Sequence, residues 1–223
     1  MSPLKCCLVG LLLGWTPALW AQALPSYDFS GQKNGPANGW LKAQGFKMER
    51  DADSIKTNFE GGRLVFTTPE GTLGLFGKEL RLVGVRKLRV TWGVLAYSKG
   101  ANWAQGKLRE PISLVVSFGD EKMDSGSSFV PNVPYFLGFF LGEKEDSTKV
   151  YLGNYFKKGG RYFCRPCQNP VGQAVTTEVD LAATFMEQFG RTMPPITGLT
   201  LEIDTRDTEG EAKAFVEKVE FLP

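Results

Sequence analysis

The residues best suited to chemistry lie in the C-terminal segment "LEIDTRDTEGEAKAFVEKVEF", residues 201–221, where acids and threonines separate two apolar stretches. Asp204 and Asp207 could accept hydrogen bonds from sugar hydroxyls or ligate a cation. Calcium needs about six to eight oxygens at regular spacing, whereas this stretch lacks the D-x-D-x-D-G pattern and has Arg206 among its acids. A polar hairpin tip is the preferred interpretation, because Asp and Thr favour turns and Gly210 permits a tight one.

The second candidate is the pair Cys164 and Cys167 in "CRPC". An oxidising compartment would tend to join these cysteines. The motif is similar to thioredoxin-like redox motifs, but those begin a helix, and Pro170 and Gly172 oppose a helix here. The sequence therefore predicts a structural disulfide in a turn, with a reduced or redox-active pair as the alternatives.

Trp103 is the third candidate, because it lies in the polar stretch "SKGANWAQGK" without apolar neighbours. An exposed indole could stack on a sugar ring or contact a partner. The alternative is an anchor, since long loops often fold back over one large side chain. If Trp103 is exposed and binds a ligand, Asp204 or Asp207 would supply acceptors for the hydroxyls or the cation of that ligand.

The absence of histidine restricts the chemistry further. It excludes Ser-His-Asp and Cys-His nucleophiles, imidazole bases and every histidine-containing metal site. Carboxylate-pair chemistry of the glycosidase type, oxygen-ligand calcium sites and plain binding stay open. We assign no catalytic residue, metal or cofactor from the sequence. The acids whose positions would decide between these options are Asp28, Glu70, Asp120, Asp204 and Asp207.

Most elements that must position these residues are predicted to be short strands. "KLRVTWGV" puts Leu88, Val90, Trp92 and Val94 on one face, and "GLTLEID" alternates in the same way over residues 198–204. The second pattern directs the Asp204 carboxylate to solvent. "YFLGFFL" is continuously apolar, which predicts a strand buried on both faces.

Two local signals refine this prediction. "DLAATFMEQFG" predicts one short helix near residues 180–190, with Asp180 capping its start and Gly190 its end. In the last strand the apolar positions change parity between Val216 and Val219, which predicts a bulge near Glu217. Many short strands, Gly-rich turns and one helix indicate an all-β fold, mainly an antiparallel β-sandwich of the jelly-roll kind.

The N-terminus predicts export. Lys5, the apolar run "CCLVGLLLGW" and the small-residue ending "AQA" form a secretory signal over residues 1–23, leaving a single domain over residues 24–223. The mature protein would be periplasmic or extracellular, without a membrane anchor. The chain has 26 Lys and Arg against 24 Asp and Glu. Such a balance, without a long run of like charges, argues against nucleic acid as a partner.

Several segments resemble the bacterial domain of unknown function 3047 family. These are "GGRLVFTTPEGTLGLFGKELRL", "LRVTWGVLAYSKG" with "ISLVVSFGD", and the whole tail from "VDLAATFMEQFG" to "VEKVEFL". The resemblance extends from about residue 61 to the end and rests on strand and turn signatures. "CRPC" and the length of "RDTEGE" depart from it. The resemblance implies a fold and export only, because the family has no assigned activity or ligand.

The function expected from the sequence is an exported, non-catalytic binding protein for a carbohydrate or a cell-envelope component. One alternative is an envelope interaction or assembly protein, which would show a large apolar surface instead of a groove. The other is a carboxylate-based glycan hydrolase or lyase, which needs two acids facing each other across a groove.

Overall fold

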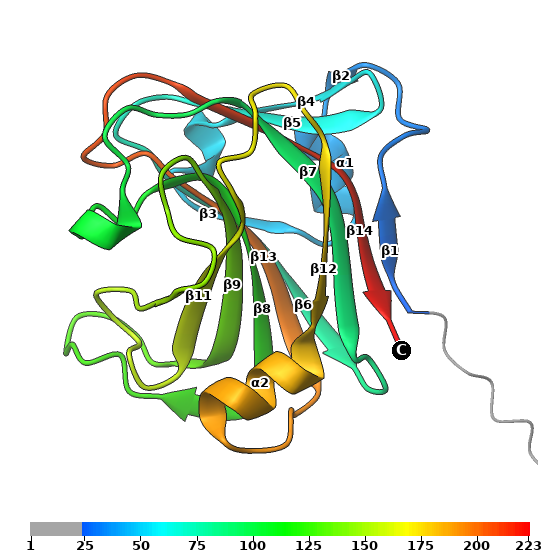
Figure 1. The fold of residues 1–223 in the computed structure, drawn as a ribbon. Coiled ribbons are helices and arrows are strands. Elements are labelled where there is room, and N and C mark those ends of the chain that lie inside the picture. Colours follow the sequence, from blue (N-terminus) through cyan, green and yellow to red (C-terminus); the bar gives the residue numbers. More distant parts are fainter. Residues whose placement is uncertain (1–23) are drawn as a thin grey trace, which may run out of the picture.

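The computed structural model describes residues 24–223, which form two facing β-sheets (Figure 1). The first sheet has the order β12 (Val175–Asp180), β7 (Lys87–Ala96), β14 (Ala212–Leu222), β5 (Arg63–Thr68), β4 (Lys56–Glu60) and β2 (Gly35–Pro36), and β1 (Ser26–Asp28) also pairs with β14. The second has the order β10 (Val150–Tyr151), β11 (Gly160–Cys167), β9 (Val133–Gly142), β8 (Glu110–Met123), β13 (Ile196–Asp204), β6 (Leu73–Leu82) and β3 (Lys47–Arg50). The predicted mainly antiparallel β-sandwich is confirmed, with one parallel pair between β9 and β11. The predicted signal, residues 1–23, lies outside the described residues.

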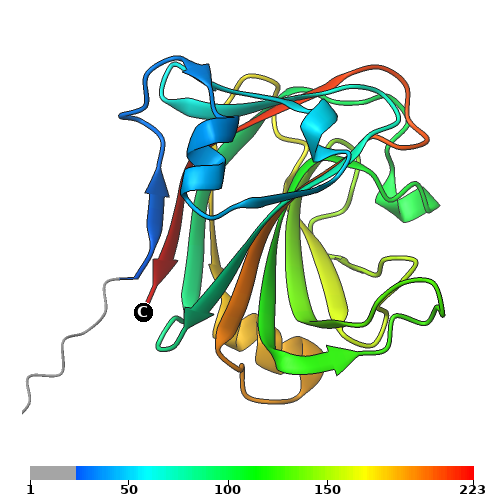
Figure 2. The same ribbon diagram turned by 180° about the vertical axis from the view of Figure 1, so that it is seen from behind.

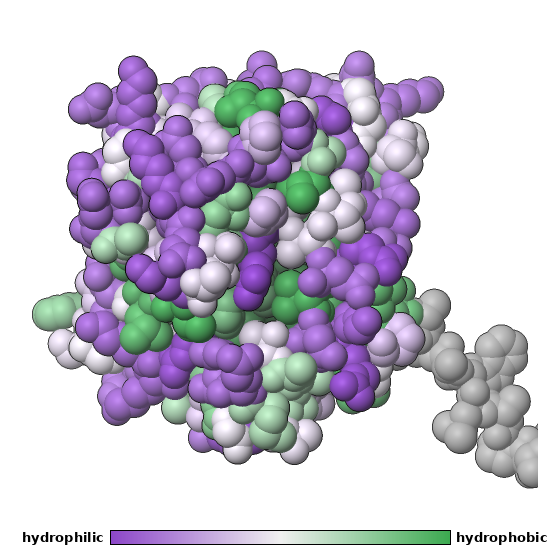
Figure 3. Space-filling model, in the orientation of Figure 1, coloured by the Kyte–Doolittle hydropathy of each residue, from purple (hydrophilic) through white to green (hydrophobic). Residues whose placement is uncertain are grey.

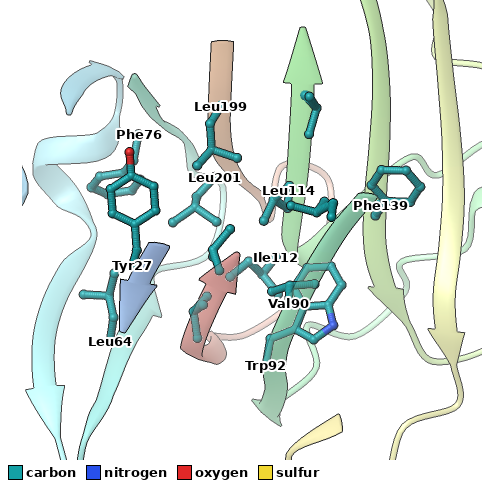
Figure 4. Close-up of a cluster of buried hydrophobic side chains, with 14 of the residues drawn as sticks. Tyr27, Leu64, Phe76, Val90, Trp92, Ile112, Leu114, Phe139, Leu199 and Leu201 are labelled. Carbon is teal, nitrogen blue, oxygen red and sulfur yellow. The ribbon is translucent and has the colours of Figure 1, made fainter. Parts of the chain in front are cut away.

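The core lies between the two sheets (Figure 4). The alternation predicted for β7 is confirmed, because its four apolar residues from Leu88 to Val94 are all buried. Leu199 and Leu201 of β13 face them from the second sheet together with Leu114 of β8. The indole N–H of Trp92 is satisfied inside the core, since it donates to the Thr177 hydroxyl at 3.0 Å.

Helix α2 (Leu181–Phe189) closes one end of the sandwich (Figure 1). Its ends are those predicted: the Asp180 carboxylate accepts from the Ala183 N–H at 2.8 Å, and Gly190 ends the helix with a φ of 67°. Leu181 and Phe185 point into the core. The structure adds a short helix that the sequence analysis did not predict, α1 (Asn38–Ala43), and two 3₁₀ turns, η1 (Ala52–Ser54) and η2 (Trp103–Gln105).

The bulge predicted in β14 is present at Glu217. Val216 lies opposite Trp92 and Lys218 lies opposite Thr91, so Glu217 is the extra residue between two pairs. The shift lets Val216 and Val219 both reach the core although they differ in parity. The freed Glu217 carbonyl accepts from the Phe29 N–H at 3.0 Å, which satisfies the backbone at the bulge.

Strand β9 is buried on both faces, as its sequence predicts. Leu137 and Phe139 point into the core, whereas Phe140 points to the outer side of the second sheet. There Trp103, Tyr151 and Cys164 cover it and form a second buried cluster. Half of the outer face of this sheet is therefore closed by the chain itself. Within residues 24–223, no helix is long and apolar enough to cross a membrane.

Candidate functional site

The other half of that outer face forms an open groove of about 800 Å³. Small residues on the adjacent strands β8, β13 and β6 form its floor. The ribbons of these three strands lie side by side in Figure 2. Thr200 of β13 lies opposite Gly77 of β6, and Gly198 lies opposite Ser117 of β8. These residues face outward because Leu199 and Leu201, between and beside them on β13, face the core.

The rim of the groove carries charges of both signs. Lys47 pairs with Glu79 at 2.6 Å, and Arg81 lies 3.7 Å from Asp120. The residues that line the groove include four cations, Lys47, Lys78, Arg81 and Lys122, and three anions, Glu49, Glu79 and Asp120. The groove as a whole is therefore close to neutral, with hydroxyls at its centre.

No neighbouring atom in the described residues requires a glycine at position 77. A Cβ built there would lie 3.4 Å from the Thr200 hydroxyl oxygen, which is ordinary contact, and the backbone is not in the left-handed region. Gly138 differs, because a Cβ there would lie 2.5 Å from the Tyr162 ring. A glycine inside a strand costs roughly 0.5–1 kcal/mol relative to alanine. Close approach of a ligand to the backbone would explain a glycine at position 77.

Glu202 follows the groove on β13 but is not one of the residues that line it. It follows Thr200 on the same face of β13, and its partner on β6 is Leu75, a groove-lining residue. Beyond it the same face continues into a buried group of acids, since Asp204 lies opposite Glu110 of β8. Glu110 and Asp204 are almost fully buried, whereas Glu202 is half-buried.

Burial and mutual repulsion change the ionisation of these acids. Burial raises the pKa of Glu110 well above its usual value, and the charges of Glu202 and Asp204 raise it further. Burial raises the pKa of Glu202 to about 7, followed by the charge of Asp204, while Arg206 and Arg109 oppose the shift. Burial also raises the pKa of Tyr162 well above its usual range, and the three nearby acids add to the effect.

Asp204 does not point to solvent, so that prediction was wrong. Its side chain is 5% exposed and is held by the Arg206 guanidinium at 2.7 Å, with the Arg109 guanidinium at 3.5 Å. It also accepts from the Arg206 backbone N–H at 3.0 Å. The outward face of β13 is covered at this end by these arginines, so Asp204 has a structural role as an acceptor inside the protein.

Asp207 is exposed, and its carboxylate pairs with the Arg109 guanidinium at 2.6 Å. The segment around it is a polar turn, but it is not the tip of a hairpin, because β13 and β14 belong to different sheets. Thr205 and Thr208 hold the turn by bonding to backbone groups. Within residues 24–223 no group of three or more acids or cysteines is arranged to hold a metal ion.

Trp103 is an anchor, and its assignment as an exposed stacking surface was wrong. The residue is 6% exposed, and its ring stacks on Phe140 with 4.8 Å between centroids. Its indole N–H donates to Glu110 at 3.0 Å, and its backbone N–H donates to Glu145 at 3.0 Å. The connection between β7 and β8 is thus fastened over the second sheet, which closes the half of the outer face beyond Glu202.

Cys164 and Cys167 are joined by a disulfide, as predicted. The bond lies at the end of strand β11 rather than in a separate turn. Cys164 is fully buried in the second cluster, against the side of the sheet that Trp103 covers. This position suits a structural bond beneath the closed half of the outer face.

Of the five acids proposed from the sequence, Asp204 and Asp207 meet at Arg109, and the other three are dispersed. Asp120 lies at the groove rim, Asp28 lies near Lys218, and Glu70 accepts from the Gly210 N–H in the connection to β14. Glu110 and Glu202, which lie close to Asp204 in the buried group of acids, were missed. Glu202 stood out only as an outward residue of a strand, and nothing in the local sequence of Glu110 indicates burial.

No family model matches the sequence, and no curated protein matches it. The solved structures that are similar include a family 29 carbohydrate-binding module (10% identity, TM-score 0.36, covering 89% of this chain and 93% of that one). They also include a cellulase derived by mutation from the Cel12A cellulase of Rhodothermus marinus (11% identity, TM-score 0.44, covering 89% of this chain and 96% of that one). A third is the carbohydrate recognition domain of Emp46p (12% identity, TM-score 0.41, covering 89% of this chain and 94% of that one). The TM-scores lie below 0.5, so these similarities carry no conclusion about the ligand of this chain.

Proposed function

We propose that the protein is an exported binding protein whose groove on the outer face of the second sheet takes a hydroxyl-rich, uncharged ligand such as a glycan chain. The floor of the groove carries this proposal. Gly77 and Gly198 let a ring approach the backbone, and Thr200 and Ser117 offer hydroxyls beside it. The near balance of charge around the groove suits a neutral ligand.

Binding fits this geometry better than hydrolysis does. A glycosidase needs two carboxyl groups on opposite sides of the bond to be cleaved, about 5–9.5 Å apart. Glu110 lies close enough to Glu202 for their charges to interact, but it is 2% exposed and accepts a hydrogen bond from the Trp103 indole. It therefore cannot reach a ligand in the groove without displacement of the anchor.

An interaction or assembly role would use a broad apolar surface. The face drawn in Figure 3 carries only a narrow apolar band between polar regions. Export is supported by the signal-like N-terminal sequence and by the disulfide, which persists in oxidising compartments.

A groove-blocking substitution tests the proposal. Thr200→Trp places a bulky ring on the floor at a half-exposed strand position that suits an aromatic residue. On an array of bacterial and plant oligosaccharides, the wild-type protein should bind a defined set of glycans. Thr200→Trp should weaken that binding by about tenfold or more, which corresponds to the loss of about 1.4 kcal/mol.

Two further variants serve as controls. Thr67→Trp puts the same side chain on the outer face of the first sheet and should bind like the wild type. Gly77→Ala should weaken binding while the protein melts at the same temperature or higher, because alanine suits a strand better than glycine. The proposal fails if the wild type binds no glycan, or if Thr200→Trp and Thr67→Trp bind equally well.

A further inference from the structure

Strand β12 ends the first sheet with an unpaired edge. It pairs with β7 alone, and alternate residues of an antiparallel strand direct their backbone groups away from the partner. In the part of the chain that the structure describes, no backbone group outside β7 bonds to those of residues 175–179. The strands at the other sheet ends are shorter, since β2 and β10 have two residues each and β3 has four, against six in β12. The edge of β12 is therefore the longest of these at which a further strand could pair.

The second sheet extends one strand beyond β12. The two sheets touch where the Thr177 hydroxyl of β12 donates to the Arg165 carbonyl of β11 at 2.9 Å, and β10 follows β11 in the sheet order. Val150 of β10 lies opposite Phe163 of β11, whose side chain belongs to the core, so Val150 also faces the first sheet. It is nevertheless 41% exposed, because the first sheet ends at β12 and does not cover it.

A cleft of about 350 Å³ opens between the two sheet edges. Phe139 and Phe163 are its deepest residues, with their rings stacked at 5.6 Å between centroids, and Val150 and Val179 line it from the two sheets. Strands β12 and β11 flank the cleft in Figure 1, and the apolar band of Figure 3 crosses the same face. The apolar side chains of an added strand would fill this cleft.

Acids outnumber cations around the cleft. Glu178, Asp180 and Glu187 line it, together with the single cation Arg165. Glu178 and Asp180 already pair with arginines in or next to β7. Glu187 of α2 forms no ion pair within residues 24–223, so a Lys or Arg side chain at that end of an added strand would meet an unpaired carboxylate.

We propose that β12 and the cleft beside it bind an extended segment of a partner protein, which adds a strand to the first sheet. Alternate side chains of the segment are apolar and enter the cleft over Phe163 and Val150, and a basic side chain meets Glu187. Main-chain hydrogen bonds to β12 supply affinity, and the cleft supplies specificity. A second copy of this chain does not suit the edge, because its own β10 would meet the projecting β10 of the first.

The probe for this site is a phage-displayed library of short random peptides, selected on the wild-type protein. Selected peptides should alternate apolar and polar residues and carry a Lys or Arg near one end. The tightest of them is then synthesised, and its binding is measured by titration calorimetry. Its binding should slow the hydrogen exchange of the β12 amides that face away from β7, because an added strand gives them hydrogen-bond partners.

Two substitutions should weaken peptide binding by about tenfold or more. Val150→Lys puts a charge in the path of the apolar side chains at an exposed position, so the melting temperature should stay that of the wild type. Glu187→Lys reverses the charge that the basic side chain meets. Val83→Lys is the matched control, because Val83 is 75% exposed in the turn between β6 and β7, and it should bind the peptide like the wild type.

Three results would overturn the inference. The first is a library that yields no alternating peptide, and the second is a peptide that binds without protecting the β12 amides or that Val150→Lys and Val83→Lys bind equally well. The third is a wild-type protein that sediments as a dimer and is dissociated by Val150→Lys, because the occupant would then be a second copy. Thr200→Trp, which blocks the glycan groove, should bind the peptide with unchanged affinity, so the two sites are tested separately.

Discussion

Trp103 joins parts of the chain that are distant in sequence. Its ring stacks on Phe140 of β9, and its indole N–H bonds to Glu110 at the start of β8. The same indole therefore stabilises the connection it belongs to and satisfies one oxygen of a buried acid. A side chain with these contacts contributes to stability rather than to ligand binding.

Removal of this anchor should be costly. Trp103→Ala should destabilise the protein by about 3–5 kcal/mol through the lost burial and the cavity left behind. For a domain of this size, that lowers the melting temperature by roughly 10 °C. Thermal unfolding followed by circular dichroism measures the effect.

Phe129→Ala is the control for that measurement, because Phe129 is 95% exposed. The Phe129→Ala protein should unfold at the same temperature as the wild type. If the Trp103→Ala protein had the same melting temperature as the Phe129→Ala protein, this would contradict the buried environment of Trp103. It would also reopen the indole as a ligand platform.

Among the elements, β11 shows how a short motif depends on its surroundings. The disulfide between Cys164 and Cys167 closes a very small loop at the end of this strand, next to the second buried cluster. Cys164 is fully buried there. Replacement by serine would bury a hydroxyl as well as break the bond, so alanine is the cleaner substitution.

We expect the bond to be present in purified protein and to contribute modestly. A loop of this length stabilises by about 2 kcal/mol in the chain-entropy model. The Cys164→Ala, Cys167→Ala double variant should therefore fold and unfold at a moderately lower denaturant concentration. Intact mass before and after alkylation tests the bond. Free thiols in the unreduced wild type, or a double variant that does not fold, would contradict this view.

Other elements follow their local sequence closely. The ends of α2 are set by Asp180 and Gly190, and the parity change in β14 is resolved by the bulge at Glu217. These features need only neighbours within a few residues, or a partner strand whose pattern is equally regular. The connection from β13 to β14 differs, because its polar sequence suits both a hairpin and the observed crossing between sheets.

At the scale of the whole molecule, export is still a prediction. The signal-like residues 1–23 predict a mature protein that begins at Leu24, just ahead of β1. N-terminal sequencing or intact mass of protein recovered from the producing cell checks this. Ala23→Trp should impair cleavage, because small residues are required before the cleaved bond. Wild-type protein that retained Met1 would contradict the prediction.

The sequence by itself determined the all-β class, the alternating strands, the helix ends, the bulge and the cysteine pairing. Each depends on periodicity or on close neighbours. The tertiary structure decided the site. Periodicity shows that Thr200 and Asp204 point away from the core, but not that Arg109 and Arg206 cover Asp204 while Thr200 lies in an open groove. Burial on an outer face is a joint property of distant segments, so only the folded chain reveals it.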